Sequence, residues 1–263
     1  MTTTQSRPER AEKTKKILHL LLLAGGAVLL FSGVFQNNIW YDEAYSYGMA
    51  HHTIPEICSI TYYDVHPPLY YILLRLYALL TGGSIVALRS FSALAGLLLS
   101  ALGYTHIRKD FGADTGLLYT LVTLLFACNF KYSIEIRMYT LAALLVMLAG
   151  IYAYRAYYDE NKKNSVLFVL FSLCAAYTQH YAFLAVVVIN IIFLVALLHK
   201  KRSVKGWLLR GAAQIVLFIP GCFYFFHQLL GVAREYWIDV EFPEVFFEAF
   251  GFFTAGDVPY YEM

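Results

Sequence analysis

The chain has 263 residues, of which 59% are hydrophobic, 17% aromatic and only 14% charged. This composition excludes an ordinary soluble domain and indicates an integral membrane protein built from helices. The formal net charge is only +2, and the basic loop at residues 200–205 indicates membrane orientation, so we expect no nucleic-acid partner. The four cysteines have the spacing of neither a zinc site nor a disulfide framework.

The N-terminal residues 1–16 are expected to form a cytoplasmic tail, and the apolar run from Ile17 to Phe35 to form the first membrane span. A bilayer core needs roughly 20 apolar residues per helix. The further expected spans are Arg89–His106, Gly112–Phe130, Tyr139–Tyr157, Ser165–Thr178, Ala182–His199 and Trp207–Phe226. The sequence therefore predicts an all-α membrane protein with about seven transmembrane helices, whose membrane module covers residues 17–226.

Residues 36–88 form a long loop between the first two expected spans. We expect two amphipathic helices in it that lie at the outer membrane surface. The first, about Asp42 to His52, begins with carboxylates at the positive end of its dipole. The second begins at Pro67-Pro68 and ends near Leu80, because proline suits a first helical turn and a dozen apolar residues are too few to span a bilayer.

The orientation of the chain follows from the distribution of Lys and Arg. These residues gather in the N-terminal tail and at residues 108–109, 155–163 and 200–210, which the positive-inside rule places in the cytoplasm. The loop at residues 36–88 and the segment at residues 227–263 then lie on the opposite side. We therefore expect a multi-pass cell-membrane protein with a cytoplasmic N-terminus and an extracytoplasmic active site.

Several residues on the expected outer face could carry chemistry. Each also has a structural interpretation. Adjacent carboxylates favour a helix start, and a histidine before two prolines can cap a turn. An ion pair at the end of a membrane helix can extend its charged groups to the membrane–water interface. Ionisable residues near the interior of a membrane bundle are nevertheless functional candidates. The candidates are Asp42, Glu43, His66, Arg75, Glu135, Arg137 and Tyr139.

Three segments together resemble the bacterial protein O-mannosyltransferase-like members of the GT-C glycosyltransferases. They are Asp-Glu just outside the first span, HPPLYYILLRLYALLTGGSIVALRSFSALAGLLLSALGY after it, and YSIEIRMYTLAAL further on. The resemblance implies a multi-span GT-C fold, a sugar donor carried on a polyprenyl phosphate, and an inverting transfer to an acceptor hydroxyl. Members of this family are longer, so residues 227–263 are expected to be the start of a C-terminal half.

Residue by residue, the resemblance puts Asp42 in the position of the catalytic base, with Glu43 beside it to orient the acceptor or a neighbouring cation. It puts His66 in the family's His-Pro-Pro. A base must take a proton from the attacking hydroxyl, and an arginine fork matches phosphate oxygens. We therefore expect Arg137 to bind the leaving phosphate, with Arg75 and His66 as alternatives. The family's Glu-x-Arg-x-Tyr falls on Glu135, Arg137 and Tyr139.

No spacing motif defines a metal site, and the sequence predicts no other cofactor. Asp64, His66 and His180 offer oxygen and nitrogen ligands on one side of the membrane and are the candidates for a divalent metal. The expected partners are a polyprenyl-phosphate-linked sugar, membrane lipid and an acceptor that the sequence does not name. Two other functions stay open: a non-catalytic protein that binds or transports lipid-linked sugar, and a truncated relative that is inactive or depends on a partner chain.

Overall fold

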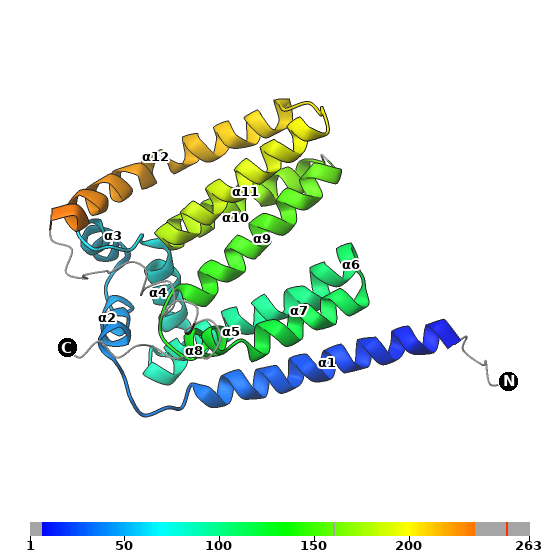
Figure 1. Cartoon of the computed structure of the whole chain (residues 1–263). Helices are drawn as coiled ribbons and strands as arrows, with labels where there is room; N and C mark the ends of the chain where they lie inside the picture. The colour runs from blue at the N-terminus through cyan, green and yellow to red at the C-terminus, as the bar shows by residue number, and fades with distance from the viewer. Residues whose placement is uncertain (1–6, 160, 235–250, 252–263) are drawn as a thin grey trace. The chain divides into compact units, whose positions relative to one another are not determined.

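The structure is a computed structural model of the chain and describes residues 7–159, 161–234 and 251. All regular elements among these residues are helices (Figure 1), which confirms the predicted all-α fold class. In chain order they are α1 (Arg7–Gly33), α2 (Tyr41–Met49), α3 (Ile54–Tyr62), α4 (Leu69–Thr81), α5 (Ile85–Leu102), the π-helical turn η1 (Gly103–Ile107), α6 (Arg108–Phe111), α7 (Ala113–Leu125), α8 (Ala127–Ser133), α9 (Tyr139–Tyr158), α10 (Lys162–Thr178), α11 (His180–His199) and α12 (Lys205–Arg234).

Within the described residues, five continuous helices are long and apolar enough to cross a membrane. They are Glu9–Gly33, Ile85–Phe111, Tyr139–Tyr158, His180–His199 and Lys205–Gly231. The pair α7 and α8 makes a sixth if both halves belong to one span. The remaining predicted span, residues 165–178, lies in α10. This helix has 17 residues and is about 25 Å long, whereas a bilayer core is about 30 Å thick.

The predicted span at residues 112–130 is interrupted at Phe126. This residue has φ −68° and ψ 115°, an extended conformation that ends α7 and begins α8, and the two helices meet at a bend of 64°. Such a break leaves helical carbonyls without their usual partners. The side chain of Asn129 satisfies one of them by donating to the carbonyl oxygen of Thr123 at 2.6 Å.

The chain divides into two compact units, each of which is built from more than one segment of the chain. The described part of the first unit comprises residues 7–39, 89–136 and 251, and that of the second comprises residues 40–88, 137–159 and 161–234. The first unit thus contains α1 and the helices from α5 to α8, and the second contains α2 to α4 and α9 to α12.

The helices of the first unit approach closely through small and polar residues. A Cβ atom on Gly103 would lie 2.5 Å from the carbonyl oxygen of Gly116, and the converse distance is also 2.5 Å, so only glycine fits at either position. The buried His19 of α1 lies 2.7 Å from the hydroxyl of Thr120, which donates to the carbonyl oxygen of Ser100 at 2.8 Å. Close backbone approach and interhelical hydrogen bonds are the interactions that usually hold membrane helices together.

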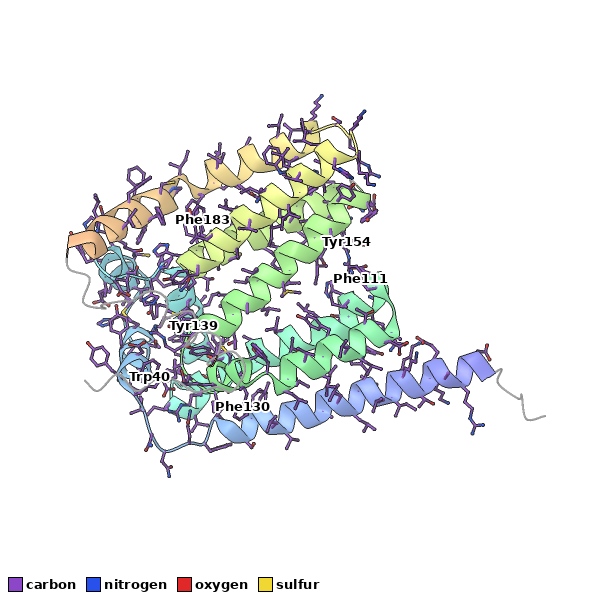
Figure 2. All side chains as sticks on the ribbon, viewed as in Figure 1. Trp40, Phe111, Phe130, Tyr139, Tyr154 and Phe183 are labelled. Carbon is purple, nitrogen blue, oxygen red and sulfur yellow. The ribbon has the colours of Figure 1, made fainter. Side chains whose placement is uncertain are left out.

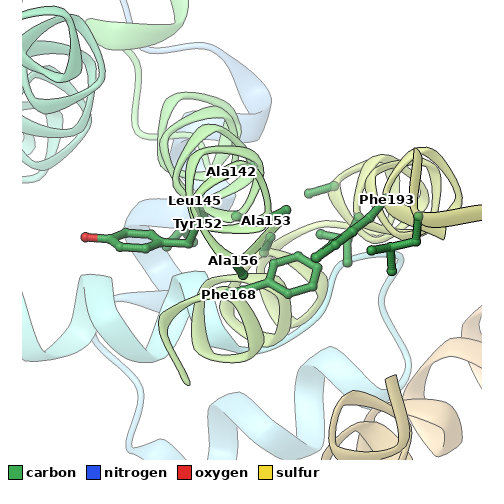
Figure 3. Packing of buried hydrophobic residues seen from close by; sticks show 12 residues of the cluster. Ala142, Leu145, Tyr152, Ala153, Ala156, Phe168 and Phe193 are labelled. Carbon is green, nitrogen blue, oxygen red and sulfur yellow. The ribbon is translucent and has the colours of Figure 1, made fainter. Parts of the chain in front are cut away.

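The core of the second unit lies where α9, α10 and α11 meet (Figure 3). Helix α9 presents the small buried residues Ala149, Ala153 and Ala156 to its neighbours, which allows close packing. Phe168 of α10 and Phe193 of α11 fill the space beside them, with ring centroids 5.9 Å apart. Large apolar side chains cover the exposed faces of α11 and α12 (Figure 2), as expected of helices that face lipid.

The loop between the first two spans contains three helices, α2, α3 and α4, where the sequence predicted two. The first ends at Met49 instead of residue 52, and α3 was missed. A capping box starts α3: the Glu56 carboxylate accepts from both the backbone N–H and the hydroxyl of Thr53, at 2.8 Å each. Helix α4 ends where Gly82 takes up φ 84°, a left-handed conformation that favours glycine.

The close contact between Gly103 and Gly116 predicts a position-dependent effect of one added methyl group. We expect Gly116→Ala to lower the free energy of unfolding by about 1–3 kcal/mol, because the methyl would press on backbone atoms. Gly25→Ala in α1 is the matched control, since a Cβ there meets nothing within 4 Å. Thermal unfolding of both variants in detergent micelles measures the difference, and equal stability would contradict the close packing.

Candidate active site

A cluster of polar side chains in the second unit is centred on Arg137, whose side chain is only 3% exposed. Its Nη2 atom lies 3.2 Å from Oδ2 of Asp42, donates to the hydroxyl of Tyr139 at 3.2 Å, and lies 3.4 Å from Nε2 of His66. Its Nη1 atom is 3.5 Å from the backbone oxygen of Asp42. One guanidinium therefore joins the start of α2, the turn before α4 and the start of α9.

Local sequence rules explain why these side chains lie at helix starts. Asp42 occupies the first turn of α2, where the helix dipole favours a carboxylate. His66 precedes Pro67 and Pro68, and Pro68 is the N-cap of α4, whose first residue is Leu69. Tyr139 is the first residue of α9. The three helix starts thus bring their polar groups to one place.

The charge of Arg137 is stabilised by its surroundings. Burial disfavours the guanidinium ion, but the hydroxyls of Tyr139 and Tyr71 and the carboxylate of Asp42 outweigh burial and raise the pKa of Arg137 above its ordinary value. The guanidinium also lies over the ring of Tyr139, 5.3 Å from the centroid. The site therefore carries a permanent positive charge in a nearly water-free position.

Asp64 and His66 form a second pair, with Oδ2 of Asp64 3.5 Å from Nδ1 of His66. A guanidinium can only donate, so Nε2 of His66 accepts from Arg137, and the proton of the neutral imidazole is assigned to Nδ1, which faces Asp64. Burial alone would raise the pKa of Asp64. Hydrogen bonds from His66, the backbone N–H of Val65 and the hydroxyl of Tyr45 outweigh burial and lower this pKa below its ordinary value.

Two tyrosines that the sequence analysis missed complete the cluster. Burial, followed by the nearby Asp64 carboxylate, raises the pKa of Tyr45, and burial also raises the pKa of Tyr71. Both hydroxyls therefore keep their protons. Their rings meet edge to face, with centroids 5.9 Å apart. The spacing of Asp42 and Tyr45, three residues apart in one helix, was the available signal for a shared face.

The other predicted site residues lie outside this cluster of side chains around Arg137. Arg75 donates to the backbone oxygen of Ala50 at 3.3 Å and so links α4 to the end of α2. Glu43 is only 1% exposed, so its side chain lies inside the protein. Glu135 belongs to the first unit and is buried there.

His180 supports the turn of His66 through a residue that sequence analysis missed, Gln228 of α12. Nε2 of His180 lies 2.6 Å from Oε1 of Gln228, and Nε2 of Gln228 donates to the backbone oxygen of His66 at 3.1 Å and to that of Thr61. The buried amide thus ties α11 and α12 to the segment before α4. A polar residue near the end of a largely apolar expected span was the available signal for Gln228.

The predicted metal candidates do not form a ligand set. Within residues 7–159 and 161–234, no three His, Cys, Asp or Glu side chains are arranged to hold a metal ion. Asp64 and His66 are paired with each other, whereas His180 reaches only the backbone of His66 through Gln228.

A family model described as dolichyl-phosphate-mannose-protein mannosyltransferase matches residues 65–224, more than half of the chain. The chain belongs to this family. Membership makes it a mannosyltransferase-like glycosyltransferase of the GT-C type and confirms the resemblance found in the sequence. The match includes His66, Arg137 and Tyr139, whereas Asp42 and Glu43 precede it. A comparison with curated proteins found no match to the chain.

The lowered pKa of Asp64 predicts how acid affects stability. A lowered pKa in the folded state contributes stability that is present above the unfolded value of about 3.9 and is lost as the pH falls through the folded pKa. At pH 7 we expect Asp64→Asn to unfold at a lower temperature than the wild type, and the difference to shrink below about pH 4. Thermal unfolding in micelles across this pH range is the test, and a constant difference would contradict the pairing.

Proposed function

We propose that the chain transfers a sugar from a polyprenyl-phosphate donor to an acceptor hydroxyl at the extracytoplasmic face of the membrane, with inversion and with Asp42 as the general base. The family description supports the donor class, since dolichyl phosphate mannose carries its sugar on a polyprenyl phosphate. The observation that carries the proposal is the buried Arg137, which holds the carboxylate of Asp42 beside His66 and Tyr139.

The geometry of Asp42 suits a base. Arg137 holds Oδ2, while the side chain keeps 34% of its surface exposed and can therefore meet an acceptor. In the proposed reaction the acceptor hydroxyl gives its proton to the carboxylate, and its oxygen attacks the anomeric carbon. The bond from that carbon to the phosphate oxygen breaks, and the polyprenyl phosphate leaves with the electron pair. A positioned base typically contributes about 10²–10⁴-fold to such a step.

Arg137 has two tasks in this proposal. It positions the carboxylate of Asp42, and its buried positive charge stabilises, through its electrostatic field, the negative charge that builds on the leaving phosphate. His66 assists as a positioning residue, because Asp64 and Gln228 fix its ring and its backbone. Glu43 is too deeply buried to touch a substrate, so we assign it no direct contact.

The lipid tail of the donor needs an apolar surface beside the site. Helix α4 begins at Leu69, three residues after His66, and exposes leucines in its second half: Leu76 is 44% exposed, Leu79 63% and Leu80 85%. Such a surface next to a charged cluster suits a ligand with a sugar phosphate at one end and an isoprenoid at the other.

Removal of the base tests the central assignment. We expect Asp42→Asn to lower sugar transfer by about 10²–10⁴-fold, because the amide cannot accept the proton of the acceptor. Glu56→Gln in the same outer loop is the control and should retain transfer, since Glu56 serves the capping box of α3. The measurement is transfer from polyprenyl-phosphate-linked mannose in proteoliposomes. Undiminished turnover by Asp42→Asn would exclude the base role.

Replacement of the arginine fork tests the positioning role. We expect Arg137→Lys to lower transfer by about 10²–10³-fold, because the shorter lysine side chain cannot place its charge where Nη2 meets Asp42, His66 and Tyr139. Arg155→Lys, on the last turn of α9, is the matched control and should leave transfer unchanged. Thermal unfolding of both variants separates a loss of activity from a loss of fold. Full activity of a folded Arg137→Lys would contradict the assignment.

A further inference from the structure

A groove of about 590 Å³ lies between α10 and α12 in the second unit, remote from the candidate active site. Its walls are formed by one face of each helix, from Lys162 to Leu173 of α10 and from Gly206 to Leu217 of α12. Along α12, Arg210 precedes Gln228, which supports the active site, by roughly 27 Å of helix. The groove is therefore a separate feature of the molecule.

One end of this α10–α12 groove is cationic. Arg210 is only 6% exposed, donates to the hydroxyl of Ser165 at 3.2 Å, and lies 5.0 Å from the ring centroid of Phe193. Lys162, in the first turn of α10, contributes a second positive charge and lies at the positive end of the α10 dipole. A buried arginine in a membrane-spanning helix marks a functional site by default.

Asp159, three residues before Lys162, takes part in the hydrogen bonds of the turn that precedes α10. Asp159 accepts a hydrogen bond from the side-chain amide of Asn161, and Asn161 caps α10 by accepting from the backbone N–H of Asn164 at 2.8 Å. Lys162 and Arg210 both line the groove at this end.

The rest of the groove is apolar and has the length of one membrane leaflet. From Lys162 to Leu173 helix α10 rises about 16 Å, as does α12 from Gly206 to Leu217, and half of a bilayer core is about 15 Å. The positive-inside rule assigns this end of both helices to the cytoplasmic side, where anionic lipids concentrate.

A neighbouring cavity of about 490 Å³ between α11 and α12 differs in this respect, because no charged side chain lines it among the described residues. It offers an apolar chain no headgroup site. Of these two cavities, the α10–α12 groove is the one that combines a cationic end with apolar walls.

We propose that the α10–α12 groove binds an anionic phospholipid of the cytoplasmic leaflet. The phosphate lies between Arg210, Lys162 and Ser165, where it accepts charge-assisted hydrogen bonds. One acyl chain lies along the apolar walls formed by Val166, Leu170, Leu209 and Leu217. Basic pockets between membrane helices on this side are suited to anionic lipid headgroups.

Native mass spectrometry of the full chain in detergent tests this proposal, with phosphatidylglycerol and phosphatidylcholine added separately. We expect one phosphatidylglycerol to be retained per chain with an affinity at least tenfold higher than that of phosphatidylcholine. Lys162→Gln should lower the affinity about fivefold, which is the usual effect of one basic residue near an anionic lipid. Lys163→Gln is the matched control, because Lys163 is equally exposed and does not line the groove, and it should leave the affinity unchanged.

Two further arms separate the lipid from other anions and from general charge attraction. Ala213→Trp should fill the groove and abolish retention while Lys162 and Arg210 remain. Inorganic phosphate in millimolar excess should not displace the lipid, since the acyl chain contributes to binding. Equal retention of the two lipids, equal losses in Lys162→Gln and Lys163→Gln, or displacement by phosphate would each overturn the proposal. Sugar transfer by the same variants is an independent measurement that reports on the proposed function alone.

Discussion

The burial of the Arg137 guanidinium is the constraint on which the rest of the site depends. A cation that is 3% exposed is costly unless anionic and hydrogen-bonding groups surround it. Asp42, His66 and Tyr139 provide these groups, and each comes from a different helix start. The need to satisfy one buried charge therefore fixes where α2, α4 and α9 begin relative to one another within the second unit.

The segment that contains α3 and α4 is held in place by α12 as well as by its own caps. Gln228 of α12 bonds the backbone oxygens of Thr61 and His66, and Tyr224 of the same helix donates to the backbone oxygen of Cys58 at 3.1 Å. These contacts attach the end of α3 and the turn before α4 to a long apolar helix. A catalytic group on a short helix gains the precision that catalysis requires when a rigid element supports it in this way.

Family membership and physical reasoning contribute different parts of the functional argument. Membership establishes a mannosyltransferase-like glycosyltransferase, and its match covers the residues that hold Asp42 but not Asp42 itself. The proposed base role instead rests on the exposure of that carboxylate and its pairing with Arg137. The two ends of the second unit then differ in kind: one gathers carboxylates, tyrosines and histidine around a buried arginine, and the other combines basic residues with an apolar groove.

Local patterns in the sequence determined the helical membrane class, five of the spans, and the helix starts at Asp42 and at Pro67-Pro68, because apolar length and capping act over a few residues. Only the tertiary structure revealed the 64° bend at Phe126, the support by Gln228, and the pairing of Arg137 with Asp42, for which the sequence had suggested separate roles. Arg137 and Asp42 are 95 residues apart, and their contact depends on how helices pack rather than on any local preference. Helix α3 is different, because Thr53 and Glu56 have the spacing of a capping box and the sequence alone was sufficient to predict its start.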